Sequence, residues 1–274
     1  LIIPILILVL ALVQIGYQIH TTGDFIKKGV SLTGGVSITI LQEKEHDISA
    51  ITKTLTSAYP DTEFSVKPIT DGRKTVGLLI DASVFENDAI QHIVDTLSEI
   101  TQIQQQQFNI EIIGESLGDS FFKSTIKALI LAFAFMAIAV FVCFRTFIPS
   151  LAIVIAAFSD MAITVAVVNL MGMSVSTAGI VALLFLIGYS VDTDILLTAR
   201  VLKRKEGTVM DRVFSSIDTG LTMTFTAIGA VLVALIFTNA EVISQIMTIL
   251  LIGLFADIFN TWIQNVGILR WYLE

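Results

Sequence analysis

Residues 177–198 read TAGIVALLFLIGYSVDTDILLT, and this stretch decides the fold of the chain. A helix needs about 20 predominantly apolar residues to cross the hydrocarbon layer of a membrane, and the stretch is long enough. It also carries Asp192 and Asp194, although a charged side chain at the bilayer centre costs about 2.5–3.5 kcal/mol on insertion scales. Because such residues usually mark a pathway or a partner, the stretch predicts a functional membrane helix.

Five further apolar runs lie around this stretch. They cover residues 1–18, 122–144, 148–170, 217–237 and 242–269. The pattern predicts an α-helical membrane protein with six transmembrane helices: span 1 (1–19), an extracytoplasmic domain (20–120) and a five-span transmembrane domain (121–274). A cleaved signal peptide is the alternative for the first run. An anchored span is favoured because the run has no basic n-region and no A-x-A-like site follows it.

Composition agrees with a membrane protein. Of 274 residues, 54% are hydrophobic and only 15% are charged, whereas soluble domains average about 25% charged residues. These values exclude a soluble enzyme and a disordered chain. The net charge of −8 argues against a nucleic-acid partner. With one cysteine, three scattered histidines and no metal-binding or Walker A motif, we expect no metal, no cofactor and no intramolecular disulfide.

Basic residues in the short loops predict the orientation. One set of same-side loops carries Arg145, Arg200, Lys203, Arg204, Lys205, Arg212 and Arg270. The opposite short loops, 171–176 and 238–240, contain no Lys or Arg. Since cytoplasmic loops carry the excess of Lys and Arg, we predict that both termini are cytoplasmic and that the large polar segment is extracytoplasmic.

The polar segment has the pattern of a small α+β domain. Strands are predicted at residues 36–41, 64–66, 76–80 and 108–113, helices at 48–59 and 89–100, and a turn at 71–72. The order βαββαβ predicts a ferredoxin-like domain between spans 1 and 2. From residue 20 to 119 there are 15 Asp and Glu against 7 Lys and Arg. This acidity provides either solubility or a surface for unfolded, often basic polypeptide.

Four aspartates lie within the predicted spans and are candidates for a proton pathway. Asp160, Asp192, Asp194 and Asp257 overlap in depth when counted at about 1.5 Å per residue, so one bundle core could gather them. Asp192 and Asp194 are about 200° apart on a helix, so at most one faces Asp160. Structural polar contacts are the alternative for Asp160 and Asp257, and an interfacial position is the alternative for Asp194.

Arg200 and a row of small polar residues accompany these carboxyl groups. Arg200 follows Asp192 by eight residues and therefore lies nearly on its face, or else it anchors the helix at the cytoplasmic surface. Thr222 and Thr226, followed by Gly229, form a narrow hydrogen-bonding face in the fifth span. Two interpretations stay open: this face relays protons beside Asp160, or it provides close helix packing.

Three motifs resemble one family of membrane proteins. Residues 187–203, IGYSVDTDILLTARVLK, resemble the fourth-span signature of the archaeal SecF family of protein-export membrane proteins. Residues 29–35, GVSLTGG, resemble the family's Gly-x-Asp-Phe-x-Gly-Gly motif, with Ser31 at the aspartate position, and residues 114–118 resemble the short element before its second span. The motif residues are Gly34, Gly35, Gly188, Tyr189 and Ser190. The one-plus-five order of spans extends the resemblance over the whole chain.

The resemblance implies a function and a partner. SecF proteins are six-span halves of assemblies in the resistance-nodulation-division superfamily. They pair with SecD in the cell membrane, among its lipids, and assist export of unfolded polypeptide through the Sec translocon, driven by the proton motive force. They are not enzymes and hold no cofactor.

The resemblance also implies roles for individual residues. Asp160 matches a third-span aspartate of the bacterial proton path, and Arg200 matches the motif arginine. The bacterial fourth-span aspartate falls on Thr193, between Asp192 and Asp194, so which carboxyl titrates stays open.

A lipid or drug exporter of the same superfamily is one alternative, although larger outer domains and twelve spans in one chain would then be expected. Two further alternatives remain. The first is a passive scaffold of the translocon without proton coupling. The second is an intramembrane aspartyl protease, whose Gly-x-Gly-Asp motif is absent because Asp160 follows Phe158 and Ser159.

Overall fold

A computed structural model provides the structure of residues 1–42, 47–60, 62, 64–71, 74–104, 108–204, 207–238 and 240–274. Gly72 of the predicted turn and Lys205 lie outside these described residues. The chain forms two compact units. A helical unit comprises Leu1–Lys27, Ile126–Leu235 and Gln245–Glu274, and an α+β unit comprises Lys28–Thr125 and Ile236–Ser244.

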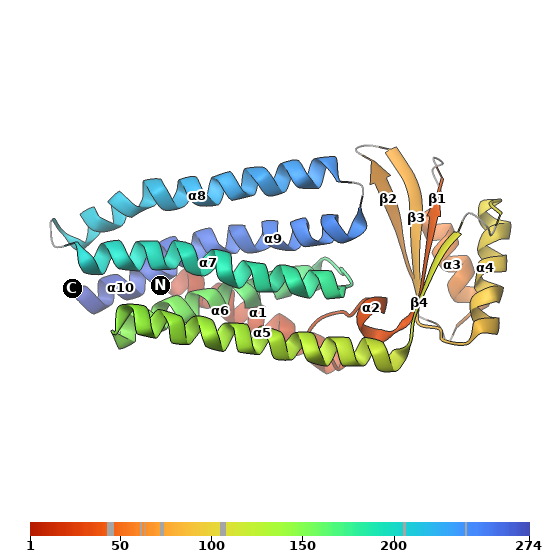
Figure 1. The fold of residues 1–274 in the computed structure, drawn as a ribbon, viewed down its shortest axis with the longest axis horizontal. Coiled ribbons are helices and arrows are strands. Elements are labelled where there is room, and N and C mark those ends of the chain that lie inside the picture. Colours follow the sequence, from red (N-terminus) through yellow and green to blue (C-terminus); the bar gives the residue numbers. More distant parts are fainter. Residues whose placement is uncertain are drawn as a thin grey trace. The chain divides into compact units, whose positions relative to one another are not determined.

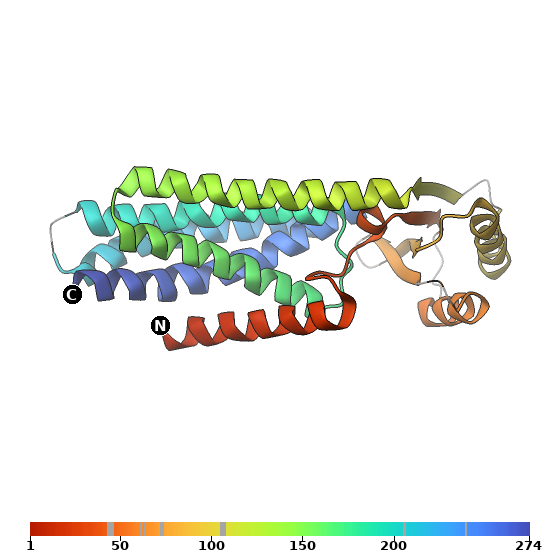
Figure 2. The ribbon, with the colours of Figure 1, turned by 90° about the horizontal axis from the view of Figure 1, so that it is seen from below.

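Six helices in the described part of the chain are long and apolar enough to cross a membrane. They are α1 (Ile2–Thr22), α5 (Glu115–Phe144), α6 (Phe147–Leu170), α7 (Thr177–Lys203), α8 (Val209–Phe237) and a sixth span over Val242–Leu273. In the helical unit they run side by side, and both chain termini lie at the same end of the bundle as the α7–α8 connection (Figures 1 and 2). The predicted number of helices capable of spanning a membrane is confirmed for the described residues.

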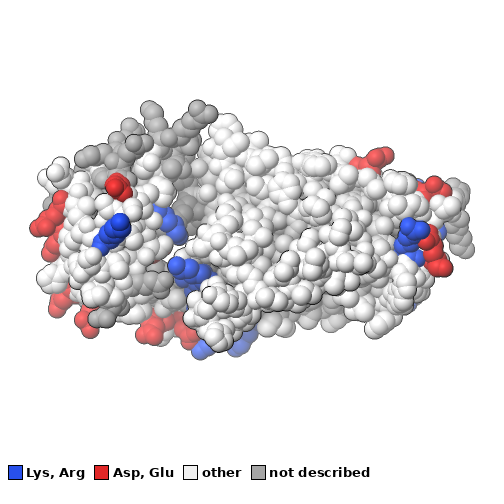
Figure 3. All heavy atoms as spheres, turned by 180° about the vertical axis from the view of Figure 1, so that it is seen from behind, with Lys and Arg blue, Asp and Glu red and all other residues white. Residues whose placement is uncertain are grey.

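Helices α6 and α7 form the centre of the helical unit. More than half of the apolar window of each is buried, whereas α1, α5 and α8 expose most of theirs. Small residues of α6, such as Ala152, Ala156 and Ala157, are buried and allow neighbouring helices to approach closely. Figure 3 shows a broad band on the helical unit without charged side chains, as a surface in contact with lipid requires.

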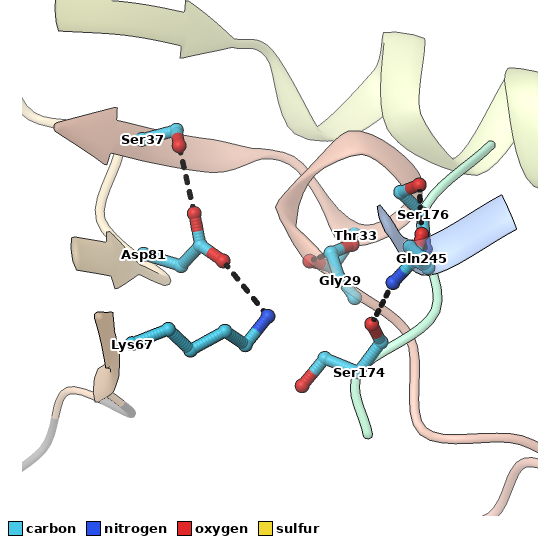
Figure 4. Close-up of polar contacts among 8 residues, drawn as sticks. All are labelled: Gly29, Thr33, Ser37, Lys67, Asp81, Ser174, Ser176 and Gln245. Atoms are coloured by element: carbon cyan, nitrogen blue, oxygen red, sulfur yellow. Dashed lines mark hydrogen bonds and ion pairs between the residues drawn. The ribbon is translucent and has the colours of Figure 1, made fainter. Parts of the chain in front are cut away.

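The connection between α6 and α7 is held by a side chain from the sixth span. The Gln245 Nε2 donates to the Ser174 carbonyl at 2.7 Å, and its Oε1 accepts from the Ser176 backbone N–H at 3.1 Å and from the Ser176 hydroxyl (Figure 4). Ser176 is also the N-cap of α7, where its hydroxyl accepts from the Gly179 N–H. These bonds fix the start of α7 and therefore the depth of the residues that follow it.

The sixth span is interrupted, although the sequence predicts a continuous helix at 242–269. It consists of α9 (Glu241–Phe259), the π-helix η2 (Asn260–Asn265) and α10 (Val266–Leu273). A π-helix has i→i+5 hydrogen bonds and is often found at functional sites. Hydrophobicity alone does not distinguish it from an α-helix, because both satisfy the backbone within the segment.

The α+β unit contains a four-stranded sheet covered on one face by two helices (Figure 1). After the short helix α2 (Val30–Thr33) come β1 (Gly35–Leu41), α3 (Ile48–Ala58), β2 (Phe64–Asp71), β3 (Lys74–Ala82), α4 (Asn87–Thr101) and β4 (Phe108–Ile113). The sheet order is β2-β3-β1-β4, and each neighbouring pair is antiparallel. Alternate residues of β1, Val36, Ile38 and Ile40, are buried against the apolar stripes of α3 and α4.

The opposite face of the sheet carries polar residues. Ser37 of β1 donates a 2.7 Å hydrogen bond to Asp81 of β3, and the Lys67 Nζ lies 3.9 Å from the other carboxylate oxygen of Asp81 (Figure 4). Ser37 and Asp81 are cross-strand partners, so this short network supports the strand register.

The two glycine-containing motifs of the α+β unit pack against each other. Gly34 has φ +82° and Gly35 has φ +130°, conformations that other residues rarely adopt. A Cβ on Gly34 would lie 2.6 Å from the Cα of Glu115, and one on Gly118 would lie 2.5 Å from the Gly34 nitrogen. Residues 29–35 and 114–118 therefore form one backbone contact that only glycine permits.

Candidate functional site: a buried carboxyl cluster

Three aspartates from three helices are buried close together in the helical unit. Asp160 lies on α6, Asp194 on α7 and Asp257 on α9, and each is 0% exposed. The prediction that one bundle core could gather the membrane aspartates holds for these three. Asp192, by contrast, is exposed, which follows from its position two residues from Asp194 on the same helix.

Asp160 is held by donors from two other elements. The hydroxyl of Ser190, on α7, donates to the Asp160 Oδ2, and the Asn260 Nδ2, on η2, donates to the Asp160 Oδ1 at 2.7 Å. Each carboxyl oxygen thus accepts a hydrogen bond from a neutral donor. Ser190, a residue of the family motif, has a definite place in the cluster.

Asp194 and Asp257 meet at one hydroxyl group. The Thr261 Oγ1, on η2, lies 3.0 Å from the Asp194 Oδ1 and 3.0 Å from the Asp257 Oδ1. The Asn265 Nδ2 donates to the same Asp194 oxygen at 2.7 Å. Asp194 is therefore buried in the core of the bundle.

The π-helix η2 supplies most of the polar partners. Its side chains at a separation of four residues form two rows. Asn260 and Gln264 face α6, where Gln264 donates to the Ser159 hydroxyl at 3.2 Å, and Thr261 and Asn265 face Asp194 of α7. The wider turn of a π-helix brings residues four apart nearly into line. The segment can therefore serve carboxyl groups on two helices at once.

Several buried oxygens of this cluster have no hydrogen-bond donor among the described residues. They are Asp194 Oδ2, Asp257 Oδ2, Asn260 Oδ1, Gln264 Oε1 and Asn265 Oδ1. All of them are acceptors. A buried polar group without a partner destabilises the fold by about 1–3 kcal/mol, so the cluster has room for further hydrogen-bond donors.

The threonines predicted for the proton path lie elsewhere. Thr222 and Thr226 are exposed on α8, and each donates at 2.6 Å to the carbonyl four residues earlier in its own helix. The expectation that they lie beside Asp160 is wrong. The buried threonine of this row is Thr224, because the inward face of α8 contains Ser216, Gly220, Thr224, Ile228 and Val231. Sequence spacing identified a polar face but not the direction in which it points.

Arg200 joins α7 to α8 near the end of α7. Its Nη1 donates to the Ser215 carbonyl at 2.5 Å, and Arg212 donates to the Val201 and Arg204 carbonyls at 2.6 and 2.8 Å. Within the described part of the chain, no ion pair links Arg200 to Asp192. These contacts fit the anchoring interpretation of Arg200.

The remaining motif residues of α7 face away from the cluster or have other partners. The Tyr189 hydroxyl donates to the Met223 carbonyl on α8 at 2.8 Å. Gly188 is exposed, and a Cβ placed on it would meet no atom within 4 Å. Thr193, at the position of the bacterial aspartate, is buried and its hydroxyl has no partner among the described residues.

Thr261 is not among the site residues predicted from the sequence. It occurs in the stretch NTWIQN at 260–265, where four polar residues interrupt an apolar run. The spacing of four residues from Asp257 to Thr261 and from Thr261 to Asn265 places the three side chains on one side of the span. That spacing was the available signal, although it does not reveal which neighbouring helix the row faces.

Comparisons with known proteins assign the family. The family described as "Protein export membrane protein SecD/SecF, C-terminal" matches residues 92–274. The chain is 39% identical over 271 residues to a protein-export membrane protein SecF of Pyrococcus furiosus, covering 98% of this chain and 89% of that protein. It is 36% identical over 276 residues to the SecF of Methanocaldococcus jannaschii, covering 99% of this chain and 94% of that protein.

Solved structures show the same fold. The crystal structure of SecDF, a translocon-associated membrane protein from Thermus thermophilus, matches with a TM-score of 0.76 and 16% sequence identity, over 98% of this chain. SecDF in a super-membrane-facing form matches with a TM-score of 0.63. The chain spans 37% of the length of that SecDF chain. From the family match and the near full-length similarity to its relatives, the chain belongs to the SecF family of protein-export membrane proteins.

Proposed function

We propose that this chain assists the export of unfolded polypeptide through the Sec translocon, as the SecF half of a SecD–SecF complex driven by the proton gradient. The observation that carries the proposal is the buried carboxyl cluster of Asp160, Asp194 and Asp257. Ionisable residues inside a membrane protein usually mark ion or proton pathways. The names of the relatives describe a role in protein export, which is a transport or accessory role.

Protonation would change how the central helices pack. A charged Asp160 accepts hydrogen bonds from α7 and from η2. A protonated carboxyl group also has an O–H that needs an acceptor. The two forms therefore favour different arrangements of α6, α7 and the sixth span. One proton crossing 100 mV supplies about 2.3 kcal/mol, which biases a two-state rearrangement by roughly fiftyfold.

The α+β unit is proposed to be a ferredoxin-like, extracytoplasmic domain between spans 1 and 2. Its element order and the sheet order β2-β3-β1-β4 support this assignment. In the proposal, residues 1–19 form the first span, 20–120 the outer domain and 121–274 the five-span domain. The outer domain contacts the exported polypeptide, and its excess of acidic residues suits basic segments of an unfolded chain.

SecD is the proposed partner, and the helical unit is the proposed site of contact. The similar solved structure is named SecDF, and this chain spans 37% of the length of that chain. Exposed Gly188 on α7 and Gly229 on α8 each leave open space where a Cβ would stand. Small residues of this kind permit close approach of helices from another subunit.

The orientation of the chain can be tested by cysteine labelling. We expect Glu99→Cys on α4 and Lys203→Cys at the end of α7 to react with a membrane-impermeant maleimide from opposite sides of sealed vesicles, with Cys143→Ser as background. Both positions are exposed, and Lys203 belongs to the basic loop set predicted to be cytoplasmic. Labelling of both positions from the same side would contradict the proposed topology.

The proposed function can be tested in vesicles with a defined pH gradient. We expect SecD to co-purify with this chain from its native membrane. In vesicles that contain the translocon and this complex, an imposed gradient should increase the amount of polypeptide that is exported. Vesicles without the complex are the control. Export that rises to the same extent with and without a gradient would favour a passive scaffold, in which the hydrogen-bonded Asp160 only joins helices.

A further inference from the structure

The hydroxyl of Thr261 has an unusual set of neighbours. Two other buried threonines of the bundle donate within their own helix: Thr164 to the Asp160 carbonyl at 2.6 Å and Thr224 to the Gly220 carbonyl at 3.2 Å. The hydroxyls of buried Thr193 and Thr198 have no partner among the described residues. Thr261 instead lies 3.0 Å from a carboxyl oxygen of Asp194 and 3.0 Å from one of Asp257. Its hydroxyl therefore bridges two acids on different helices.

The bridge needs one more proton than the Thr261 hydroxyl provides. A hydroxyl group has one proton, so Thr261 can donate to only one of the two carboxyl oxygens. If both Asp194 and Asp257 were ionised, the second contact would place two oxygen atoms 3.0 Å apart, with their lone pairs facing and no proton between them. The contact becomes a hydrogen bond when one carboxyl group is protonated and donates to the threonine oxygen.

Among the residues that the structure describes, no buried cationic side chain lies beside the pair. The buried polar residues in the described part of the chain include no Lys, Arg or His. The titratable group from α6 is Asp160, whose two oxygens already have donors. The half-buried Tyr189 of α7 donates its hydroxyl to the Met223 carbonyl. Among the described residues, the Asp194 Oδ2 and the Asp257 Oδ2 have no hydrogen-bond partner. The Ser190 hydroxyl, which donates to Asp160, also lies near the Asp257 carboxyl group and is neutral.

We infer that Asp194 and Asp257 share a single proton through the hydroxyl group of Thr261. In one form, Asp257 carries the proton and donates to the Thr261 oxygen, and Thr261 donates to Asp194. Transfer breaks the O–H bond of Asp257 and that of Thr261, and forms one O–H bond on Thr261 and one on Asp194. The net change is one proton moved from α9 to α7, with Thr261 returned to its hydroxyl form.

The position of Thr261 in η2 connects this transfer to helix geometry. Asn265 donates to the Asp194 oxygen that also contacts Thr261, so the π-helix holds Asp194 at the bridge from two positions. The adjoining residue Asn260 donates to Asp160. Movement of the shared proton would therefore change the hydrogen bonds of η2, the element that contacts all three acids. The inference rests on the proposed proton-driven function and deepens it, because it makes the Thr261 hydroxyl the group that relays the proton.

The shared proton can be tested by infrared spectroscopy of the SecD-bound complex in lipid at neutral pH. We expect a carbonyl band of a protonated carboxyl group that is lost in both Asp194→Asn and Asp257→Asn. An asparagine amide supplies the N–H that replaces the shared proton, so Thr261 is free to donate to the remaining carboxylate. The absence of such a band in the native protein, its survival in both variants, or its loss in only one of them would overturn the shared proton.

Variants of Thr261 separate the bridge from simple packing. Thr261→Val keeps the shape but removes the hydroxyl, so the carboxyl band should shift as its hydrogen bond is lost. Thr261→Ser should restore the native band, and Thr224→Val, at a buried threonine outside the bridge, should leave it unchanged. A native band in Thr261→Val would refute the relay. Because the spectrum is recorded without export, a failure of gradient-driven secretion would contradict the proposed function while leaving this result intact.

Discussion

Asp160→Asn should abolish the gradient-dependent part of protein export while the chain still inserts and associates with SecD. Asparagine has nearly the size of aspartate and can keep an acceptor for Ser190 or Asn260, but it cannot titrate. If Asp160 carries the coupled proton, the bias of roughly fiftyfold that one proton supplies at 100 mV is lost. Export with and without an imposed pH gradient, measured in vesicles of each variant, gives the effect.

A matched control is available on the neighbouring helix. Asp192→Asn makes the same chemical change at an exposed position outside the cluster, and we expect it to keep most of the gradient-dependent export. Asp160→Leu provides a second comparison, since it leaves the donors of Ser190 and Asn260 unpaired, at about 1–3 kcal/mol each, and should also reduce assembly. Full gradient-dependent export by Asp160→Asn would rule out Asp160 as the proton carrier.

Gly34→Ala should cause the largest loss of stability in the α+β unit. Gly34 has φ +82°, and a Cβ there would lie 2.6 Å from the Cα of Glu115, an atom that cannot move without shifting α5. Backbone strain of about 1–3 kcal/mol and overpacking of about 1–3 kcal/mol should add. Hydrogen exchange of β1 and β4, which both adjoin this contact in sequence, should become much faster.

The control for this substitution has a similar positive φ without the clash, although its ψ of −11° is left-handed helical whereas the ψ of Gly34 is 168°. Gly23 has φ +80°, and a Cβ there would meet no atom within 4 Å. Gly23→Ala should therefore show only the cost of the left-handed conformation, about 1 kcal/mol, and leave exchange in β1 and β4 near native values. Equal effects of the two substitutions would show that the contact between the two glycine motifs is unimportant.

The elements of the chain were predictable because their determinants are local or are set by the solvent. The hydrocarbon thickness fixes the length of a span, so the apolar runs at 148–170 and 177–198 predicted α6 and α7. The alternation of residues 36–41 predicted β1, and the stripe of α4 at Ile90, Ile93 and Leu97 is buried as its period of 3.6 requires. Strand β4, Phe108–Ile113, has the predicted bounds.

The helix face that points inward was less predictable. In a membrane, both faces of a span are apolar, and the contrast that orients a helix in water is weak. Thr222 and Thr226 therefore suggested a polar face toward Asp160, whereas packing placed Thr224 inside. The same uncertainty applied to Asp192 and Asp194, for which helix geometry excluded a shared face but did not choose between them.

The sequence by itself determined the six spans, the strands and helices of the α+β unit, and the four membrane aspartates, because length, hydrophobicity and period are properties of neighbouring residues. Only the tertiary structure decided that Asp160, Asp194 and Asp257 meet, that Asp192 does not join them, and that Thr261 lies between two acids. The physical reason is that these contacts join α6, α7 and a π-helical segment of the sixth span. Residues 100 positions apart, such as Asp160 and Asn260, come within 2.7 Å through the packing of whole helices, which no local pattern in the chain encodes.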